Sequence, residues 1–176
     1  MTLLRDLPII PDPSKKWLNA RQRVDYREHR EDLLEWLCVF GKDPEHAEGY
    51  SHATVKNTAY RTDQFYRWVW EREGYTTDLI RNHADRYLRE LAGQDTSTSH
   101  KAKCVKALKR LFKWRVHEKG GEPWKPQLTF SDAGNATQPR DFLTKAERSR
   151  IREAALKYGS IPSYNSLTTD VHHLVM

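Results

Sequence analysis

The chain has 176 residues, a length that fits one domain or one domain with a fragment of another. Its formal net charge of +6 is typical of proteins that bind nucleic acid. No apolar run approaches the length of about 20 residues that crosses a membrane, and the first residues lack a signal-peptide core. We therefore expect no membrane partner and a cytoplasmic, nucleoid-associated protein.

The first forty residues predict an arm and then a helix. Three prolines punctuate residues 1–14, which predicts an extended N-terminal arm. Ser14 is a suitable N-cap for a long helix over residues 15–40. The first half of that helix is highly charged, so residues 19–30 form either a separate helix or a solvated extension.

Two further helices follow. Ser51 is a suitable N-cap for a helix over residues 53–72, whose apolar residues recur at helical spacing. Thr77 or Asp78 caps a third helix over residues 79–91. The polar face of the helix over residues 53–72 mixes cations with amides that can contact phosphates and adenine edges. Its members are Lys56, Asn57, Tyr60, Arg61, Gln64 and Arg67, and the acidic residues Asp63 and Glu71 interrupt it.

The helix predicted over residues 96–119 has two contrasting faces. Its apolar side is to be buried against other helices, and it carries Cys104, Val105, Leu108, Leu111 and Phe112. Its other side carries Lys103, Lys106, Lys109, Arg110, Lys113 and His117. Glu118 is the only carboxylate in the stretch. A long face of one charge sign favours a polyanion, most simply nucleic acid.

The remaining residues predict a linker and a last helix. Prolines and a Ser-Asp-Ala-Gly-Asn cluster indicate a linker over residues 122–142. Thr144 and Glu147 form a capping-box pattern at the start of a short helix. No segment predicts a strand, so the expected fold class is all-α. Cys38 and Cys104 fall in helical apolar patterns and are expected to be reduced core residues.

Four stretches, taken in order, resemble the core-binding domain of tyrosine recombinases, the phage-integrase family, with archaeal integrases the most similar. They are SHATVKNTAYRTDQFYRW at 51–68, TSHK at 98–101, LKRLFKW at 108–114 and DFLTKAE at 141–147. The resemblance implies a small four-helix, SAM-like bundle over residues 15–121 that binds duplex DNA. It also implies that residues 143–176 begin a truncated catalytic domain.

The basic faces and the resemblance together predict a set of DNA-binding residues. They are Ser51, Thr54, Lys56, Asn57, Arg61, Gln64, Thr98, Ser99, His100, Lys103, Lys106, Lys109, Arg110, Lys113, Arg140 and Lys145.

The resemblance also indicates which catalytic residues of the family this sequence lacks. The family cleaves DNA with a tyrosine nucleophile assisted by arginines, a lysine and histidines or a tryptophan. Nothing between Ala146 and Met176 matches the first arginine motif, and Tyr158 and Tyr164 come too early to be the nucleophile. We therefore expect no catalytic residue, and no strand cleavage by this chain alone. No cofactor or metal site is expected either, since no Cys-x-x-Cys is present.

Three alternatives remain open. The chain could be a fragment of a full recombinase that is active when complemented by another chain, a non-catalytic helical regulator, or a helical protein-interaction module that binds no DNA. Separately, Trp68, Trp70 and Trp114 could stack on bases, although aromatic residues at helical spacing are more often core. Other recombinase protomers are possible partners, and the chain alone is expected to be a monomer.

Overall fold

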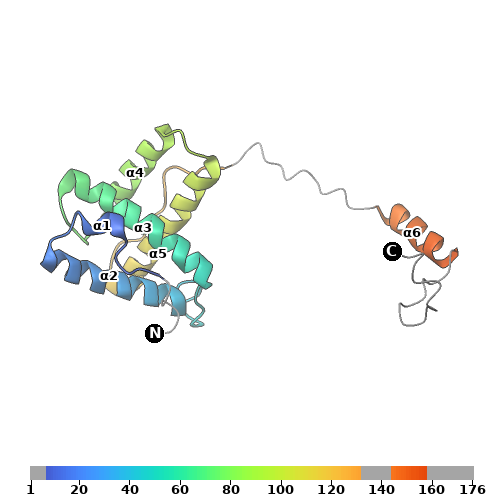
Figure 1. Ribbon diagram of the computed structural model, residues 1–176, viewed down its shortest axis with the longest axis horizontal. Helices are drawn as coiled ribbons and strands as arrows, with labels where there is room; N and C mark the ends of the chain where they lie inside the picture. Colours follow the sequence, from blue (N-terminus) through green and yellow to red (C-terminus); the bar gives the residue numbers. More distant parts are fainter. Residues whose placement is uncertain (1–6, 132–143, 158–176) are drawn as a thin grey trace, which may run out of the picture. The chain divides into compact units, whose positions relative to one another are not determined.

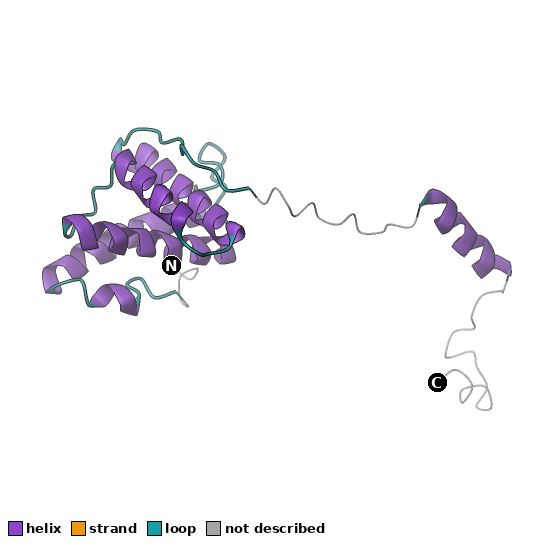
Figure 2. Ribbon diagram, turned by 90° about the horizontal axis from the view of Figure 1, so that it is seen from above, coloured by secondary structure: helices purple, strands orange, loops and turns teal. Residues whose placement is uncertain are grey.

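The computed structural model of this protein describes residues 7–131 and 144–157. The chain divides into two compact units, Met1–Asp132 and Ala133–Met176. Within the described residues the helices are joined by loops and turns and no strand is present, so the predicted all-α fold is confirmed (Figure 2).

The first unit is a bundle built around α3 and α5 (Figure 1). Helix α5 packs most extensively on α3, while α2 and α4 each contact both of them. The helices of this unit are α1 (Asp12–Lys15), α2 (Ala20–Val39), α3 (His52–Glu73), α4 (Arg81–Gly93) and α5 (Thr98–Lys119). The second unit contains α6 (Lys145–Lys157).

The apolar faces predicted for the two central helices are buried. Helix α5 begins after Ser97, whose side chain accepts a hydrogen bond from the backbone N–H of His100, and ends at Gly120. Gly120 has a φ of 63°, in the left-handed region that glycine adopts without a steric cost. The residues that α5 buries include all five predicted ones, namely Cys104, Val105, Leu108, Leu111 and Phe112. Those of α3 include Val55, Ala59, Thr62, Phe65, Tyr66, Val69 and Trp70.

The predicted start of the helix over residues 15–40 is wrong. Helix α2 begins at Ala20, and Asn19 caps it in a reciprocal box with Gln22. Ser14 lies in the separate short helix α1, where it is buried and donates a hydrogen bond to Asp63 at 2.6 Å. The charged first half of α2 is continuous with the rest, and its Tyr26 is fully buried.

Helix α4 begins two residues later than its caps predicted. The backbone N–H of Ile80 donates to Nδ1 of His83 at 3.2 Å, so His83 closes the first turn in place of Thr77 or Asp78. The apolar residues that α4 buries include Tyr87, Leu88 and Leu91.

The first part of the predicted linker packs against the bundle. Trp124 is half-buried against the core, and its Nε1 donates to Asp85 of α4 at 3.1 Å. Leu128 and Phe130 also pack against the core. Residues 1–6, 132–143 and 158–176 lie outside the described residues, and Tyr158 and Tyr164 are among them.

Candidate nucleic-acid interface

A groove of about 190 Å³ lies between α3 and α5, where the two helices pack against each other. Both helices contribute residues at positions i, i+3, i+4 and i+7, the spacing that aligns side chains along one side of a helix. The lining residues are Thr54, Asn57, Thr58 and Arg61 from α3 and Lys103, Lys106, Ala107 and Arg110 from α5.

Small side chains form the floor of this groove. Thr58 and Ala107 are each 1% exposed, and neither is large enough to fill the space between the helices. The longer cationic side chains of Arg61, Lys103, Lys106 and Arg110 line the rest of the groove. Sequence reasoning identified the cations but missed Thr58 and Ala107, since a buried small residue carries no chemical signal by itself.

Arg110 is held in place from two sides. Its Nη1 donates a hydrogen bond to Oγ1 of Thr58 at 3.2 Å. Its guanidinium carbon lies 4.6 Å from the ring centroid of Tyr50, a cation–π distance. These contacts fix the direction of the guanidinium before any ligand arrives.

Arg61 is held by its own helix. Its Nη1 donates to the backbone oxygen of Asn57 at 2.9 Å and to the side-chain Oδ1 of Asn57 at 3.3 Å. Its Nε is buried and has no hydrogen-bond partner among the residues that the structure describes. Burial raises the pKa of the nearby Cys104 thiol, and the positive charge of Arg61 opposes that rise.

The charged side chains that line the groove are all cationic. Arg61, Lys103, Lys106 and Arg110 line it, and no carboxylate is among the lining residues. An anion in the groove would meet several charge-assisted hydrogen-bond donors at once, the arrangement that phosphate oxygens favour.

The prediction that Asp63 interrupts the basic face of α3 is wrong. Asp63 is 1% exposed and lies on the inner side of α3. There it accepts hydrogen bonds from Ser14 and Tyr26 and pairs with Arg67 at 3.1 Å. Its charge is thereby compensated within the bundle. The polar face of α3 is more uniformly cationic than its sequence indicated.

The other predicted residues of α3 and α5 lie outside the groove lining. Lys56 and Gln64 are exposed on α3, and Lys109 is exposed on α5. Nζ of Lys113 donates to the carbonyls of Gly41 and Lys42, at 3.0 and 2.9 Å, and so holds the loop after α2.

The residues predicted at the two helix starts form local contacts. Ser51 precedes α3, and its hydroxyl donates to Oγ1 of Thr54 at 3.1 Å. Thr98 and Ser99 occupy the first turn of α5, after the actual cap. His100 lies beside Cys104, with Nε2 at 3.5 Å from the sulfur.

Two predicted residues belong to the other end of the chain. Lys145 is the first residue of α6 and is exposed. Arg140 lies outside the described residues.

The three tryptophans considered for base stacking are packed against other side chains. Trp70 and Trp114 are 5% and 0% exposed, so their rings belong to the core. The ring of Trp68 is covered by the guanidinium of Arg72, at 4.2 Å from its centroid. The core interpretation of these residues is confirmed, and they offer no open platform for a base.

The described residues contain no group of three or more His, Cys, Asp or Glu side chains that could hold a metal ion. None of the helices in residues 7–131 and 144–157 has the length and apolar character to cross a membrane. In comparisons with known proteins, no family model, curated protein or solved structure matches the chain.

Proposed function

We propose that this protein binds duplex DNA through the groove between α3 and α5, as the core-binding domain of a tyrosine recombinase does. The single observation that carries the proposal is the convergence of four cations from two helices with no carboxylate among the lining residues. Both arginines are already positioned by neighbouring groups, which reduces the entropy lost on binding.

In this proposal the cations contact backbone phosphates and supply most of the affinity. Each neutralised phosphate releases counterions, so four contacts give a slope of about −3 to −4 in a plot of log K against log salt. Amide groups on the outer face of α3 reach base edges in the major groove. Asn57 and Gln64 are the candidates, because an amide can pair with adenine in two positions.

The recombinase assignment rests on the four sequence stretches and agrees with the helical bundle. The proposed role is to hold a recombination site while the cleavage chemistry is supplied by residues of the kind that this sequence lacks. DNA integration and site-specific recombination are then the processes in which the chain takes part.

A triple charge reversal tests the groove. The variant carries Lys103→Glu, Lys106→Glu and Arg110→Glu. We expect it to lose duplex binding at low salt in a fluorescence-anisotropy titration while its circular dichroism still reports a helical fold. A matched control carries Lys16→Glu, Arg21→Glu and Arg27→Glu, which change the net charge equally at exposed positions away from the groove.

The control is expected to keep most of the affinity. Equal loss in the two variants would indicate general charge attraction and would contradict a specific groove. If the unaltered chain binds no duplex, the DNA proposal fails and a helical protein-interaction module becomes the better interpretation.

A further inference from the structure

Helix α6 carries a cationic stripe of its own. Lys145, Arg148, Ser149 and Arg152 line a hollow of about 360 Å³ along one side of this helix. Their spacing of three, four and seven residues places them on a single face. No carboxylate is among them. The stripe repeats the charge pattern of the α3–α5 groove on a second unit of the chain.

The carboxylate of Glu147 accepts hydrogen bonds at the start of α6. Oε2 of Glu147 accepts hydrogen bonds from the backbone N–H and the hydroxyl of Thr144, at 2.6 and 2.8 Å. In return, the N–H of Glu147 donates to the Thr144 hydroxyl at 3.2 Å. These bonds lower the pKa of the Glu147 carboxyl. The predicted capping box is therefore confirmed, and these bonds engage Glu147 with Thr144 and not with the stripe.

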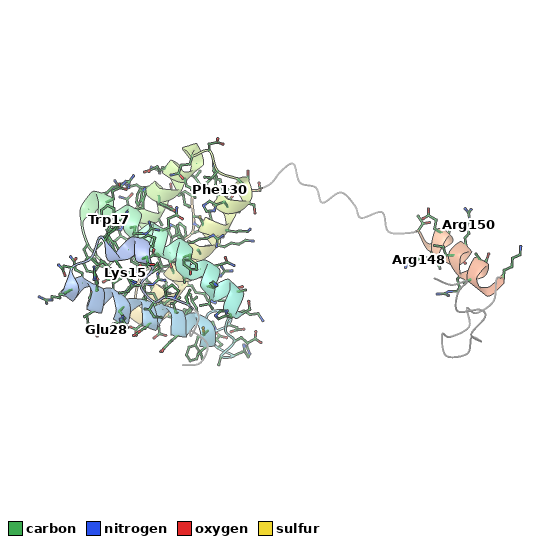
Figure 3. All side chains as sticks on the ribbon, viewed as in Figure 1. Lys15, Trp17, Glu28, Phe130, Arg148 and Arg150 are labelled. Atoms are coloured by element: carbon green, nitrogen blue, oxygen red, sulfur yellow. The ribbon has the colours of Figure 1, made fainter. Side chains whose placement is uncertain are left out.

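The opposite flank of α6 has mixed charge. Glu153 lies three residues after Arg150 and four before Lys157, the spacings at which opposite charges on a helix attract each other. Arg148 and Arg150 leave the helix on different sides (Figure 3), as expected for positions two residues apart. Both sides of the helix are exposed, but the flank with Arg150 carries charges of both signs, whereas the charged residues of the stripe are all cationic.

We propose that Lys145, Arg148 and Arg152 form a second phosphate-binding element that engages the same duplex as the α3–α5 groove. The inference rests on the proposed DNA-binding function and adds Arg148 and Arg152 to Lys145, the one residue of the stripe that the sequence already placed among the DNA-binding residues. Lys145 and Arg152 are about 10 Å apart along the helix axis, at 1.5 Å per residue. Because each DNA strand carries one charge per 3.4 Å of axis, this length matches about two or three phosphates.

The second contact strengthens binding because both elements belong to one chain. Once the groove has engaged the duplex, the stripe binds at a high effective concentration and needs little intrinsic affinity. Its contribution should therefore appear as tighter binding and a steeper salt dependence of the whole chain.

Two double variants with the same change in net charge test the proposal in the full chain. One carries Arg148→Gln and Arg152→Gln on the stripe, and the other carries Arg150→Gln and Lys157→Gln on the mixed flank. Glutamine and arginine have similar helix propensities, so both variants should keep α6 helical. Affinity for a short duplex is measured by fluorescence anisotropy over a series of salt concentrations.

We expect the stripe variant to bind about tenfold more weakly, with a salt slope smaller in magnitude by about 2, since two phosphate contacts are lost. The mixed-flank variant should stay close to the unaltered chain. Equal losses in the two variants, or no loss in either, would overturn the inference. The triple groove variant separates the two proposals. If that variant loses DNA binding while the stripe variant binds like the unaltered chain, the groove remains the DNA site and α6 is excluded.

Discussion

The guanidinium of Arg110 donates a hydrogen bond to the hydroxyl of Thr58, and this bond of 3.2 Å joins α5 to α3 across the floor of the groove. The Thr58 hydroxyl donates in turn to the carbonyl of Thr54 at 2.8 Å, which leaves an oxygen lone pair facing the arginine. A buried threonine therefore orients a cation that the sequence marks only as part of a basic face.

Replacing Thr58 with valine is expected to weaken duplex binding by about three- to tenfold, because Arg110 loses the acceptor that orients it. The shape of the side chain is retained, so the free energy of unfolding should fall by only about 1 kcal/mol. Fluorescence anisotropy measures the first quantity and urea denaturation the second.

Thr62→Val is the matched control. Its hydroxyl is buried on the same helix and donates to the carbonyls of Thr58 and Ala59, but Thr62 does not line the groove. Its loss should lower stability by a similar amount and leave DNA affinity unchanged. If both valine variants bind DNA equally well, Thr58 has no orienting role.

His29 gives the bundle a dependence on pH. Its ring packs edge-on against Trp114, at 5.0 Å between centroids, and its Nε2 lies 2.6 Å from the hydroxyl of Tyr66. Burial, reinforced by the positive charges of Arg115 and Lys119, lowers the pKa of His29 to about 4. Asp25 and Asp32 oppose this shift more weakly.

The sign of the stability change follows from this lowered pKa. The unfolded chain, with an ordinary His29 pKa of 6.5, takes up a proton before the folded chain does. Stability is therefore complete above the unfolded pKa and falls as pH falls toward the folded pKa. We expect a loss of about 2 kcal/mol between about pH 7.5 and about pH 5.

Urea denaturation at a series of pH values measures this loss. The variant His29→Gln keeps a polar group near Tyr66 and does not titrate, so its stability should change less over the same interval. An identical pH profile for the two chains would contradict a neutral, buried His29.

The sequence predicted the two central helices well because periodicity and local end signals agree there. In α3 and α5 the apolar residues recur every three or four positions, and a serine precedes each helix. The start of α2 was missed because Ser14 and Asn19 are both good caps. The reciprocal capping box of Asn19 with Gln22 and the tertiary contact of Ser14 with Asp63 together decide between them.

The sequence predicted the basic face of α3 and that of α5, but not how the two faces form one site. The cations of α3 and α5 were identified separately, because helical spacing shows which residues share a face. How the two faces meet depends on packing at Thr58 and Ala107, which local patterns do not encode. The burial of Asp63 was missed for the same reason, since its partners come from other elements as well as from α3.

Asp63 is the buried charge that joins the N-terminal elements to α3. Its Oδ1 accepts hydrogen bonds from Ser14 at 2.6 Å and from Tyr26 at 3.0 Å. Arg30, which is fully buried, approaches the same oxygen at 3.7 Å, and Arg67 pairs with the other oxygen at 3.1 Å. The carboxylate thus compensates a cation that has no access to solvent.

Replacing Asp63 with asparagine keeps the volume but removes the charge that balances Arg30. An uncompensated buried cation costs about 3 to 5 kcal/mol, so we expect the free energy of unfolding in urea to fall by that amount. Glu71→Gln removes an exposed carboxylate from the same helix and should change stability by less than about 0.5 kcal/mol. If Asp63→Asn lowers the free energy of unfolding as little as this control does, the buried network contributes little to holding α1 and α2 against α3.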